Sequence, residues 1–367
     1  MSKPTQKKRL SRYVPDKGAF PDLVLRDRDY KILRLVYDHR FLSGELLWHL
    51  LQSDGESSVV SYTVGSDGKK RPKKYGFGRQ ALSKRLKQLF NARFLERHYI
   101  TDQPMGRGYG APGAIYGLGP ACPKILQERL DIPTEVTRRI IDGNKVKSPF
   151  LRHALEVATF RATLELACER NSENVKLLFW EQGDSIRDFV IGVNEKGDDE
   201  RIPVHADAFF GLEVTGAGRT HFFLEIDRGT EPIASSKQRT DIRRKLIGYR
   251  LYRKSKKFPK RYAYRQLPNG QIVGIDVCAN QSTEGRKMIT GFQVLFVTPG
   301  VIKPDKKLSG RIASIFAEFA ALGKFYVTNS LFWFTPPERI AITKPDRIFS
   351  KCWITPSPQN DLMSMVE

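Results

Sequence analysis

The sequence predicts a multi-domain α/β protein, with three helices and a β-hairpin first and a mixed sheet covered by helices after them. Two patterns lead to this fold class. Residues 23–120 show apolar side chains at helical spacing and then two strand-like segments, whereas residues 150–345 alternate between strand-like and helical segments. The 367 residues, 40% of them hydrophobic, are enough for two domains with separate cores. We expect a basic arm at 1–22, a linker at 121–149 with short helices at 122–130 and 134–141, and a tail at 346–367.

The first two helices are predicted between residues 25 and 50. Ile32, Leu33 and Val36 repeat at helical spacing, and Ser43 suits the N-cap position of the second helix. Residues 53–75 then interrupt the pattern. They are rich in Ser and Gly and end in Lys-Lys-Arg-Pro-Lys-Lys, so we expect a flexible basic loop there.

The third helix is predicted from Gly78 to Asn91, and a hairpin follows it. The apolar residues of this helix form one stripe: Ala81, Leu82, Leu86 and Leu89. Residues 94–100 alternate like a strand, residues 114–118 return, and a glycine-rich tip joins them. Three helices and a hairpin are typical of a winged helix-turn-helix, whose third helix enters the major groove of DNA. A winged helix that contacts only other proteins is the alternative.

The positive charge of the chain is concentrated in two stretches. The 62 Lys and Arg residues exceed the 40 Asp and Glu residues, which gives a net charge of +22. Residues 1–100 hold 22 basic and 10 acidic side chains, and residues 232–261 hold 12 and 1. Clustered charge of this kind favours double-stranded DNA as the partner over an acidic membrane surface. The residues expected to contact DNA are Lys73, Lys74, Arg79, Ser83, Lys84, Lys87, Arg107, Arg228, Arg243 and Arg244.

The cysteines and the apolar segments indicate where the protein acts. The four cysteines lie far apart without a CxxC pair, which is typical of reduced thiols and argues against a zinc site. The basic N-terminus does not resemble a secretory signal. The sequence also contains no run of about 18 apolar residues, the length that a membrane-spanning helix requires. We therefore expect a cytoplasmic, nucleoid-associated protein.

The second domain is predicted to open with a helix over Arg152–Glu169. Strand-like segments follow it at residues 175–180, 188–193, 202–210, 221–226, 293–298 and 325–328. Helical segments intervene at residues 235–254 and 309–322. Strands and helices in this order indicate a mixed sheet with helices packed on it.

Two neighbouring strands of this domain carry acidic residues inside apolar runs. Asp207 lies in the first, and Glu225 and Asp227 lie two residues apart in the second, on one face of the strand. Buried carboxylates are costly without a compensating cation, so these three are expected to hold Mg²⁺ or Mn²⁺ through hard oxygen ligands. The alternative is a buried ion-pair network of Asp227, Arg228 and Glu231, with a basic helix after it that only holds DNA.

An acid on one strand, an acidic pair on the next and then a helix resemble the PD-(D/E)xK nuclease superfamily. That resemblance implies catalytic roles for Asp207, Glu225 and Asp227, whose metal ions would activate water for hydrolysis at phosphorus. Asp227 stands where the superfamily has a lysine. The resemblance therefore implies that a lysine has moved to the following helix, where Lys245 is the expected catalytic residue and Lys237 the other candidate.

A longer series of segments is similar to the replication-relaxation family of plasmids, conjugative elements and other mobile DNA. The segments that carry this resemblance are Leu33–Ser43, Arg85–Leu89, Phe94–Arg97, His205–Ala208, Phe223–Pro232 and Lys245–Tyr249. The resemblance covers roughly residues 23–330 and implies a winged helix joined to a nuclease-like domain. The sequence departs from the family pattern at His205, where proline is common, and in insertions at 53–75 and 264–291.

Three functions follow from these patterns as hypotheses. The first is a DNA-binding protein of a mobile element that acts in replication initiation or origin processing, with or without metal-dependent nicking. The second is a non-catalytic winged-helix regulator whose degenerate nuclease-like domain serves dimerisation. The third is an endonuclease in element defence or integration.

A second copy of the chain and other proteins of the same element are the further expected partners. Tyr249 and Tyr252 are candidates for a covalent tyrosine–DNA link, although both fit a packing role better.

Overall fold

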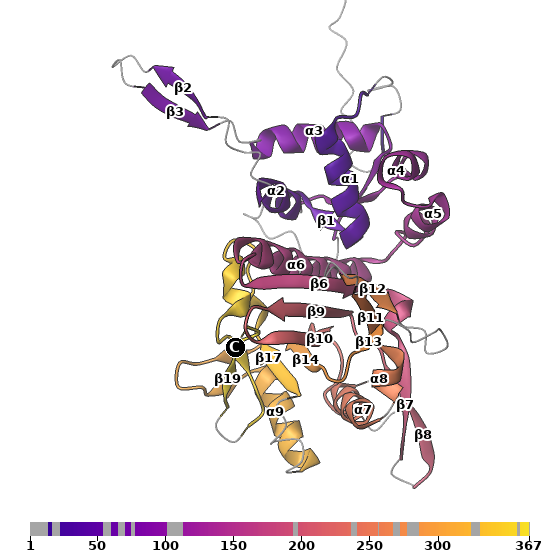
Figure 1. The fold of residues 1–367 in the computed structure, drawn as a ribbon, viewed down its shortest axis with the longest axis vertical. Helices are drawn as coiled ribbons and strands as arrows, with labels where there is room; N and C mark the ends of the chain where they lie inside the picture. The colour runs from indigo at the N-terminus through magenta and orange to yellow at the C-terminus, as the bar shows by residue number, and fades with distance from the viewer. Residues whose placement is uncertain are drawn as a thin grey trace, which may run out of the picture. The chain divides into compact units, whose positions relative to one another are not determined.

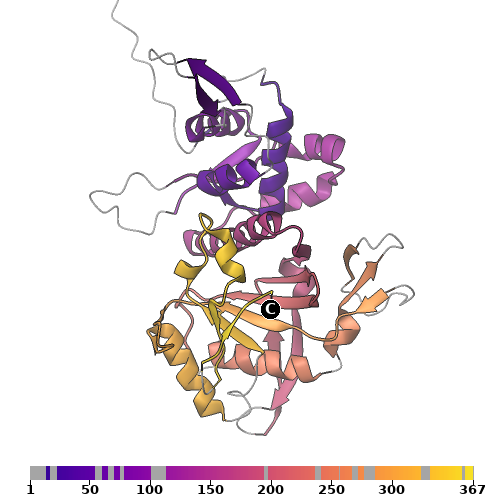
Figure 2. The same cartoon turned by 60° about the vertical axis from the view of Figure 1, so that its left-hand side comes forward.

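The structure is a computed structural model that describes residues 14–16, 23–53, 60–64, 70–74, 78–100, 113–193, 197–235, 241–255, 257–266, 272–276, 286–323, 331–357 and 360–366. The chain is mixed α/β and divides into two compact units, residues 1–162 and 163–367 (Figures 1 and 2). Within the described residues, none of the helices combines the length and the apolar character that crossing a membrane requires.

The first unit contains three helices where the apolar spacing predicts them. They are α1 (Asp27–His39), α2 (Gly44–Ser53) and α3 (Arg79–Asn91). The expected N-cap of α2 is confirmed, because the hydroxyl of Ser43 accepts a hydrogen bond from the Leu46 N–H at 3.2 Å. In α3, the leucines of the predicted stripe are buried, whereas Ala81 is exposed. Ala81 lies at the margin of that stripe, where a single methyl group tolerates water.

An ion pair between a buried carboxylate and a half-buried guanidinium connects α1 to α3. The guanidinium of Arg85 donates to both carboxylate oxygens of Asp29, at 2.8 and 2.5 Å. Asp29 also accepts the N–H of Arg26 at the start of α1, and its side chain is only 2% exposed. The paired, bidentate geometry is the kind that offsets the cost of removing both charges from water.

A small sheet completes the core of the first unit. β4 (Leu95–His98) and β5 (Ile115–Leu118) pair antiparallel, as the alternating segments predict. The two-residue strand β1 (Leu42–Ser43) pairs with the other side of β5, so the strand order is β1-β5-β4. The tip between β4 and β5, including Arg107, lies outside the described residues.

The segment between α2 and α3 contains a hairpin, which corrects the expectation of a flexible loop. β2 (Val60–Val64) pairs antiparallel with β3 (Lys70–Lys74) in continuous register. Val60, Tyr62 and Val64 alternate with polar residues, and this period-2 pattern is the strand signal that the Ser/Gly content obscures. Lys73 and Lys74 therefore lie on a strand.

The two short helices expected in the linker are confirmed. They are α4 (Cys122–Leu130) and α5 (Thr134–Asp142), and α4 packs against both α1 and α5 within the first unit. The long helix α6 (Ser148–Arg170) follows, and the boundary between the two units falls within it.

A seven-stranded mixed sheet forms the centre of the second unit (Figure 1). In the order in which they lie side by side, its strands are β19 (Leu362–Met363), β18 (Trp353–Ile354), β17 (Phe332–Thr335), β14 (Gln293–Val297), β10 (Gly218–Ile226), β9 (Ala208–Val214) and β6 (Val175–Glu181). β10, β14 and β17 are parallel to one another, and the remaining pairs are antiparallel. The predicted strand at 325–328 lies outside the described residues.

One face of this sheet is covered by α7 (Ile242–Lys254) and α9 (Arg311–Leu322). Phe223 of β10 and Phe296 of β14 share one buried cluster with Tyr249 of α7 and Phe319 of α9. Each fully buried aromatic side chain of this kind contributes about 2–3 kcal/mol through the area that it removes from water. Side chains two residues apart on β10 therefore point toward these helices.

The segment predicted as one strand over residues 202–210 is two strands. β8 (Asp199–Val204) pairs with β7 (Asp188–Val193) in a separate two-stranded ribbon, and β9 begins only at Ala208. Residues 205–207 form the bend between them. The sequence is apolar on both sides of the bend, so its periodicity alone does not show the break.

The remaining elements of the second unit are short. They are η1 (Gly183–Ile186), α8 (Lys257–Arg261), β11 (Ala263–Gln266), β12 (Ile272–Asp276), β13 (Arg286–Met288), β15 (Val301–Ile302), β16 (Leu308–Ser309), η2 (Pro337–Arg339) and η3 (Pro345–Phe349). β11, β12 and β13 form a small sheet that begins at Ala263 and otherwise lies in the 264–291 insertion. Cys122, Cys168 and Cys352 are free thiols buried in the structure, and burial raises the pKa of Cys122 and of Cys168 to about 12.

Candidate functional site

The exposed face of α3 carries the residues expected to contact DNA. Four of these residues are exposed: Arg79, Ser83, Lys84 and Lys87. The last three lie four, five and eight residues after Arg79, which places all four on one side of the helix. α3 contains no acidic residue. The helix therefore presents a positively charged surface opposite its buried leucines.

Arg79 is held in place at the start of this face. Its guanidinium lies 4.5 Å from the centre of the Trp48 ring and 3.4 Å from a carboxylate oxygen of Glu45. The side chain is still 61% exposed. Stacking on Trp48 reduces the number of orientations of Arg79 without removing it from solvent, which suits a contact to a planar acceptor.

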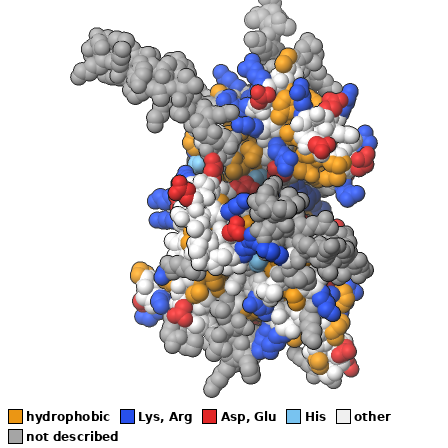
Figure 3. Space-filling model, in the orientation of Figure 1, with side chains coloured by type: hydrophobic (Ala, Val, Ile, Leu, Met, Phe, Trp, Pro, Cys, Tyr) orange, Lys and Arg blue, Asp and Glu red, His pale blue; other side chains and the backbone are white. Residues whose placement is uncertain are grey.

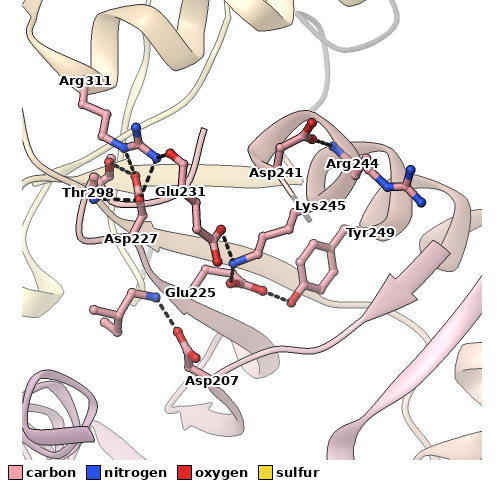
Figure 4. Close-up of polar contacts among 12 residues, drawn as sticks. Asp207, Glu225, Asp227, Glu231, Asp241, Arg244, Lys245, Tyr249, Thr298 and Arg311 are labelled. Carbon is pink, nitrogen blue, oxygen red and sulfur yellow. Dashed lines mark hydrogen bonds and ion pairs between the residues drawn. The ribbon is translucent and has the colours of Figure 1, made fainter. Parts of the chain in front are cut away.

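In the second unit, Asp207 lies at the bend before β9 and makes the last hydrogen bonds between this segment and β10. Its backbone N–H donates to the carbonyl of Leu224 at 2.9 Å, and its side chain accepts the N–H of Ile226 at 2.7 Å. The carboxylate thus lies beside the end of β10 (Figure 4).

Glu225 is buried on the sheet face that α7 covers, where it contacts two side chains of that helix. Lys245 Nζ lies 2.9 Å from one carboxylate oxygen, and the hydroxyl of Tyr249 donates to the other at 2.5 Å (Figure 4). Lys245 also lies 3.0 Å from Glu231. The structure therefore brings together Asp207, Glu225 and the lysine that the sequence predicted to have moved to the helix.

The protonation of this centre follows from burial and from neighbouring charge. Burial raises the pKa of Glu225 to about 7, and nearby Lys245 opposes that rise only in part. Burial acts to lower the pKa of Lys245, but the attraction of Glu225, Glu231 and Asp207 is stronger and raises it. Because three carboxylates act on one ammonium, Lys245 stays charged and Glu225 is the group that titrates near neutral pH.

Asp227 faces the same side of the sheet but binds α9. Arg311 donates to both of its carboxylate oxygens, at 2.5 and 2.9 Å, and the hydroxyl of Thr298 donates at 2.6 Å. The N–H of Gly229 adds a fourth contact at 2.9 Å. The cation that these contacts give Asp227 is therefore Arg311, which the ion-pair alternative did not include.

These contacts decide whether the residues fit the expected divalent metal. Both oxygens of Glu225 and both oxygens of Asp227 accept from protein donors, and the two carboxylates are held by different helices. In the part of the chain that the structure describes, no three His, Cys, Asp or Glu side chains are grouped to hold a metal ion. Asp207, Glu225 and Asp227 do not fit a shared Mg²⁺ or Mn²⁺ site in this arrangement.

The other basic residues predicted for DNA binding in this unit are engaged within it. Arg243 pairs with Glu318, and Arg244 donates to Glu200 at 2.7 Å. Arg228 is half-buried. Tyr252 is fully buried and donates to Asp188, and Tyr249 is occupied by Glu225, so neither hydroxyl is exposed for a covalent link to DNA.

Sequence reasoning missed two partners of the acidic centre, Arg311 and Thr298. Arg311 lies 84 residues after Asp227, and no local pattern connects them. Thr298 had a usable signal, because it directly follows a parallel strand. Polar side chains at the carboxyl ends of adjacent parallel strands meet at one edge of the sheet.

The fold and the site define a class of protein: a two-unit α/β chain with a basic helix face in one unit and a buried carboxylate–lysine centre in the other. The family profile for replication-relaxation matches residues 33–266, more than half of the chain, so the chain belongs to the replication-relaxation family. No curated protein and no solved structure matches it.

Proposed function

We propose that this chain is a DNA-binding protein that acts in replication initiation or origin processing of a plasmid or another mobile element. The observation that carries the proposal is the exposed face of α3, where Arg79, Lys84 and Lys87 project without a neighbouring acid on the helix. Phosphate groups are the partners that such clustered charge attracts. Membership of the replication-relaxation family is consistent with this role.

The element order of the first unit supports a winged helix-turn-helix. Helix, short strand and helix come first as α1, β1 and α2, the hairpin of β2 and β3 is inserted after them, and α3, β4 and β5 follow. In proteins of that architecture, the third helix enters the major groove and presents its side chains to base edges. The counterpart here is α3, and Arg79 is the residue best suited to a bidentate contact with guanine.

The hairpin of β2 and β3 is proposed as a second contact of the first unit. β3 reads Lys-Arg-Pro-Lys-Lys, and it directly precedes α3 in the chain. A strand so rich in positive charge suits the sugar-phosphate backbone, which carries no sequence information. Lys and Arg side chains are also prominent on both units in the face that Figure 3 draws.

Duplex binding is tested by its dependence on salt. Fluorescence anisotropy with duplexes that tile the origin region of the element should show log K falling linearly with log salt concentration between 50 and 200 mM. Each phosphate that the protein neutralises contributes about 0.9 to the slope, so contacts from α3 and the hairpin together predict a slope of about −4 or steeper. Absence of binding to every duplex at 50 mM salt would contradict the proposed function.

For the second unit, the contacts of the carboxylates favour a role without catalysis. Lys245 and Arg311 neutralise the acids that a nuclease would need free, although the placement of Asp207, Glu225 and Lys245 resembles the PD-(D/E)xK arrangement. Dimerisation and contacts to other proteins of the element stay predictions.

Cleavage of supercoiled DNA distinguishes a non-catalytic second unit from one with metal-dependent nicking activity. The protein, incubated with supercoiled plasmid and millimolar Mg²⁺ or Mn²⁺, should leave the plasmid intact. If open-circular product forms with wild type and is lost with Glu225→Gln, the nicking alternative holds. Glu213→Gln is the matched control, because Glu213 is a half-buried acid of the same sheet that pairs with Arg219.

A further inference from the structure

A second group of basic side chains surrounds the start of the β7–β8 ribbon in the second unit. We call Arg187, Arg201, Lys257 and Arg261 the ribbon-base cluster. Two of its members lie against one aromatic ring: the Phe189 ring centre is 3.6 Å from the guanidinium carbon of Arg201 and 3.8 Å from Lys257 Nζ. Two cations beside one ring repel each other, so this arrangement becomes favourable when anions approach it.

The acids that touch the cluster are fewer than its cations. Lys257 and Arg261 both pair with the same buried carboxylate, Asp188. Arg187 pairs with Asp184 at 2.8 Å, but both side chains are mainly exposed, and water and salt screen such pairs. Arg201 contacts no carboxylate among the described residues, and it is exposed. The cluster therefore keeps an excess of positive charge toward solvent.

The scaffold holds these cations in fixed positions. Arg261 donates to the backbone carbonyls of Ser185 and Arg187, at 3.0 and 2.8 Å, and Lys257 donates to the carbonyl of Phe189 at 2.9 Å. Arg201 is fixed by its stacking on Phe189. Cations that are positioned before a ligand arrives lose little conformational entropy when they bind it.

His205 connects the cluster to the acidic centre. It is exposed at the bend between β8 and β9, two residues before Asp207. Partial burial of the ring lowers its pKa, and the charges of Arg187, Arg201 and Lys245 lower it further, against the opposing effect of Asp184. The same positive potential thus extends from the ribbon-base cluster to the lysine that binds Glu225.

We propose that the ribbon-base cluster binds the sugar-phosphate backbone of DNA and gives the second unit a DNA contact of its own, leading to the Asp207–Glu225–Lys245 centre. Guanidinium groups match phosphate oxygens in charge and in geometry, and Arg201 is the exposed member with no competing acid. This inference rests on the proposed function, because it needs a protein that binds DNA. It places the contact on β8, on α8 and on Arg187 directly before β7, whereas the sequence predicted it on α7 through Arg243 and Arg244.

The test compares two charge-neutralising double variants of the full-length chain. Arg187→Gln with Arg201→Gln removes two exposed charges of the cluster and leaves the pairs of Asp188 intact. Lys344→Gln with Arg347→Gln removes two exposed charges elsewhere in the same unit and is the matched control. Affinity for a duplex that wild type binds is measured between 50 and 200 mM salt, and melting temperatures confirm that both variants fold like wild type.

The cluster variant should flatten the plot of log K against log salt concentration by about 1.8, which corresponds to two lost phosphate contacts. The control should keep the wild-type slope, and Arg187→Lys with Arg201→Lys should restore it. If the cluster variant and the control have equal slopes while wild type binds, this inference fails and the proposed function stands. If wild type binds no duplex, the proposed function fails, and this inference fails with it.

Discussion

Duplex DNA should bind about a hundredfold more weakly when Arg79, Lys84 and Lys87 are all replaced by alanine. All three are exposed on α3, and each contact of a basic side chain to a base edge or phosphate contributes about 1 kcal/mol or more. The single change Arg79→Ala should act differently from Lys84→Ala. Because Arg79 can bind guanine in a bidentate manner, its loss should reduce discrimination between specific and random duplexes more than it reduces non-specific affinity.

The control for this experiment is a triple variant of exposed basic residues on other helices or loops of the first unit. Lys124, Arg138 and Lys147 serve this purpose, since their replacement removes the same net charge. Anisotropy titrations at one salt concentration compare the two triple variants with wild type. Equal losses in both would mean that overall charge, and not the face of α3, determines binding.

Replacing Lys245 by methionine should lower the free energy of unfolding by about 3 kcal/mol at pH 8. The change leaves Glu225, which is 2% exposed, without the cation that neutralises it, and an unpaired buried charge is strongly destabilising. Urea denaturation measures the loss. Lys254→Met, at the exposed end of the same helix, is the matched control and should change stability by less than about 0.5 kcal/mol.

The effect should depend on pH in a defined direction. In the wild type, the pKa of Glu225 is about 7 when folded, against about 4.3 for an unfolded glutamate. The folded state therefore holds the proton more tightly, and the stability that this provides is lost as the pH rises from about 4 to 7. Without Lys245 the pKa of Glu225 is higher still, so the folded variant keeps its proton up to a higher pH. The loss of unfolding free energy caused by Lys245→Met should therefore become smaller as the pH is lowered. Glu225→Gln should remove this pH dependence, and a Lys245→Met variant as stable as wild type at pH 8 would contradict the burial argument.

Periodicity in the sequence predicted most of the regular elements. α1, α3, β7 and the hairpin of β4 and β5 lie within a few residues of their predicted ranges, because each shows one clear period of apolar residues. The proximity of Lys245 to Glu225 was expected only from the resemblance to the PD-(D/E)xK superfamily, which places a lysine beside the acidic pair. Local pattern and turn signals suffice for single helices, strands and hairpins.

Relations between distant residues could not be predicted in this way. Arg311 reaches Asp227 only because α9 packs on the same face of the sheet as α7, and that depends on the order of parallel strands. The hairpin of β2 and β3 was missed because its Ser and Gly content resembles a loop. The spacing of Glu225 and Asp227 placed these two acids on one face, but it could not show that two different helices bind them.

That division of the acids between two helices has a consequence for how the second unit opens. Glu225 is bound by α7 and Asp227 by α9, and both acids belong to the end of one strand. If either helix moved away from the sheet, Glu225 or Asp227 would remain beside the aromatic core without the cation that neutralises it. Partial opening of either helix is therefore costly, and the backbone amides of α7 and α9 should exchange with solvent in one cooperative event together with β10.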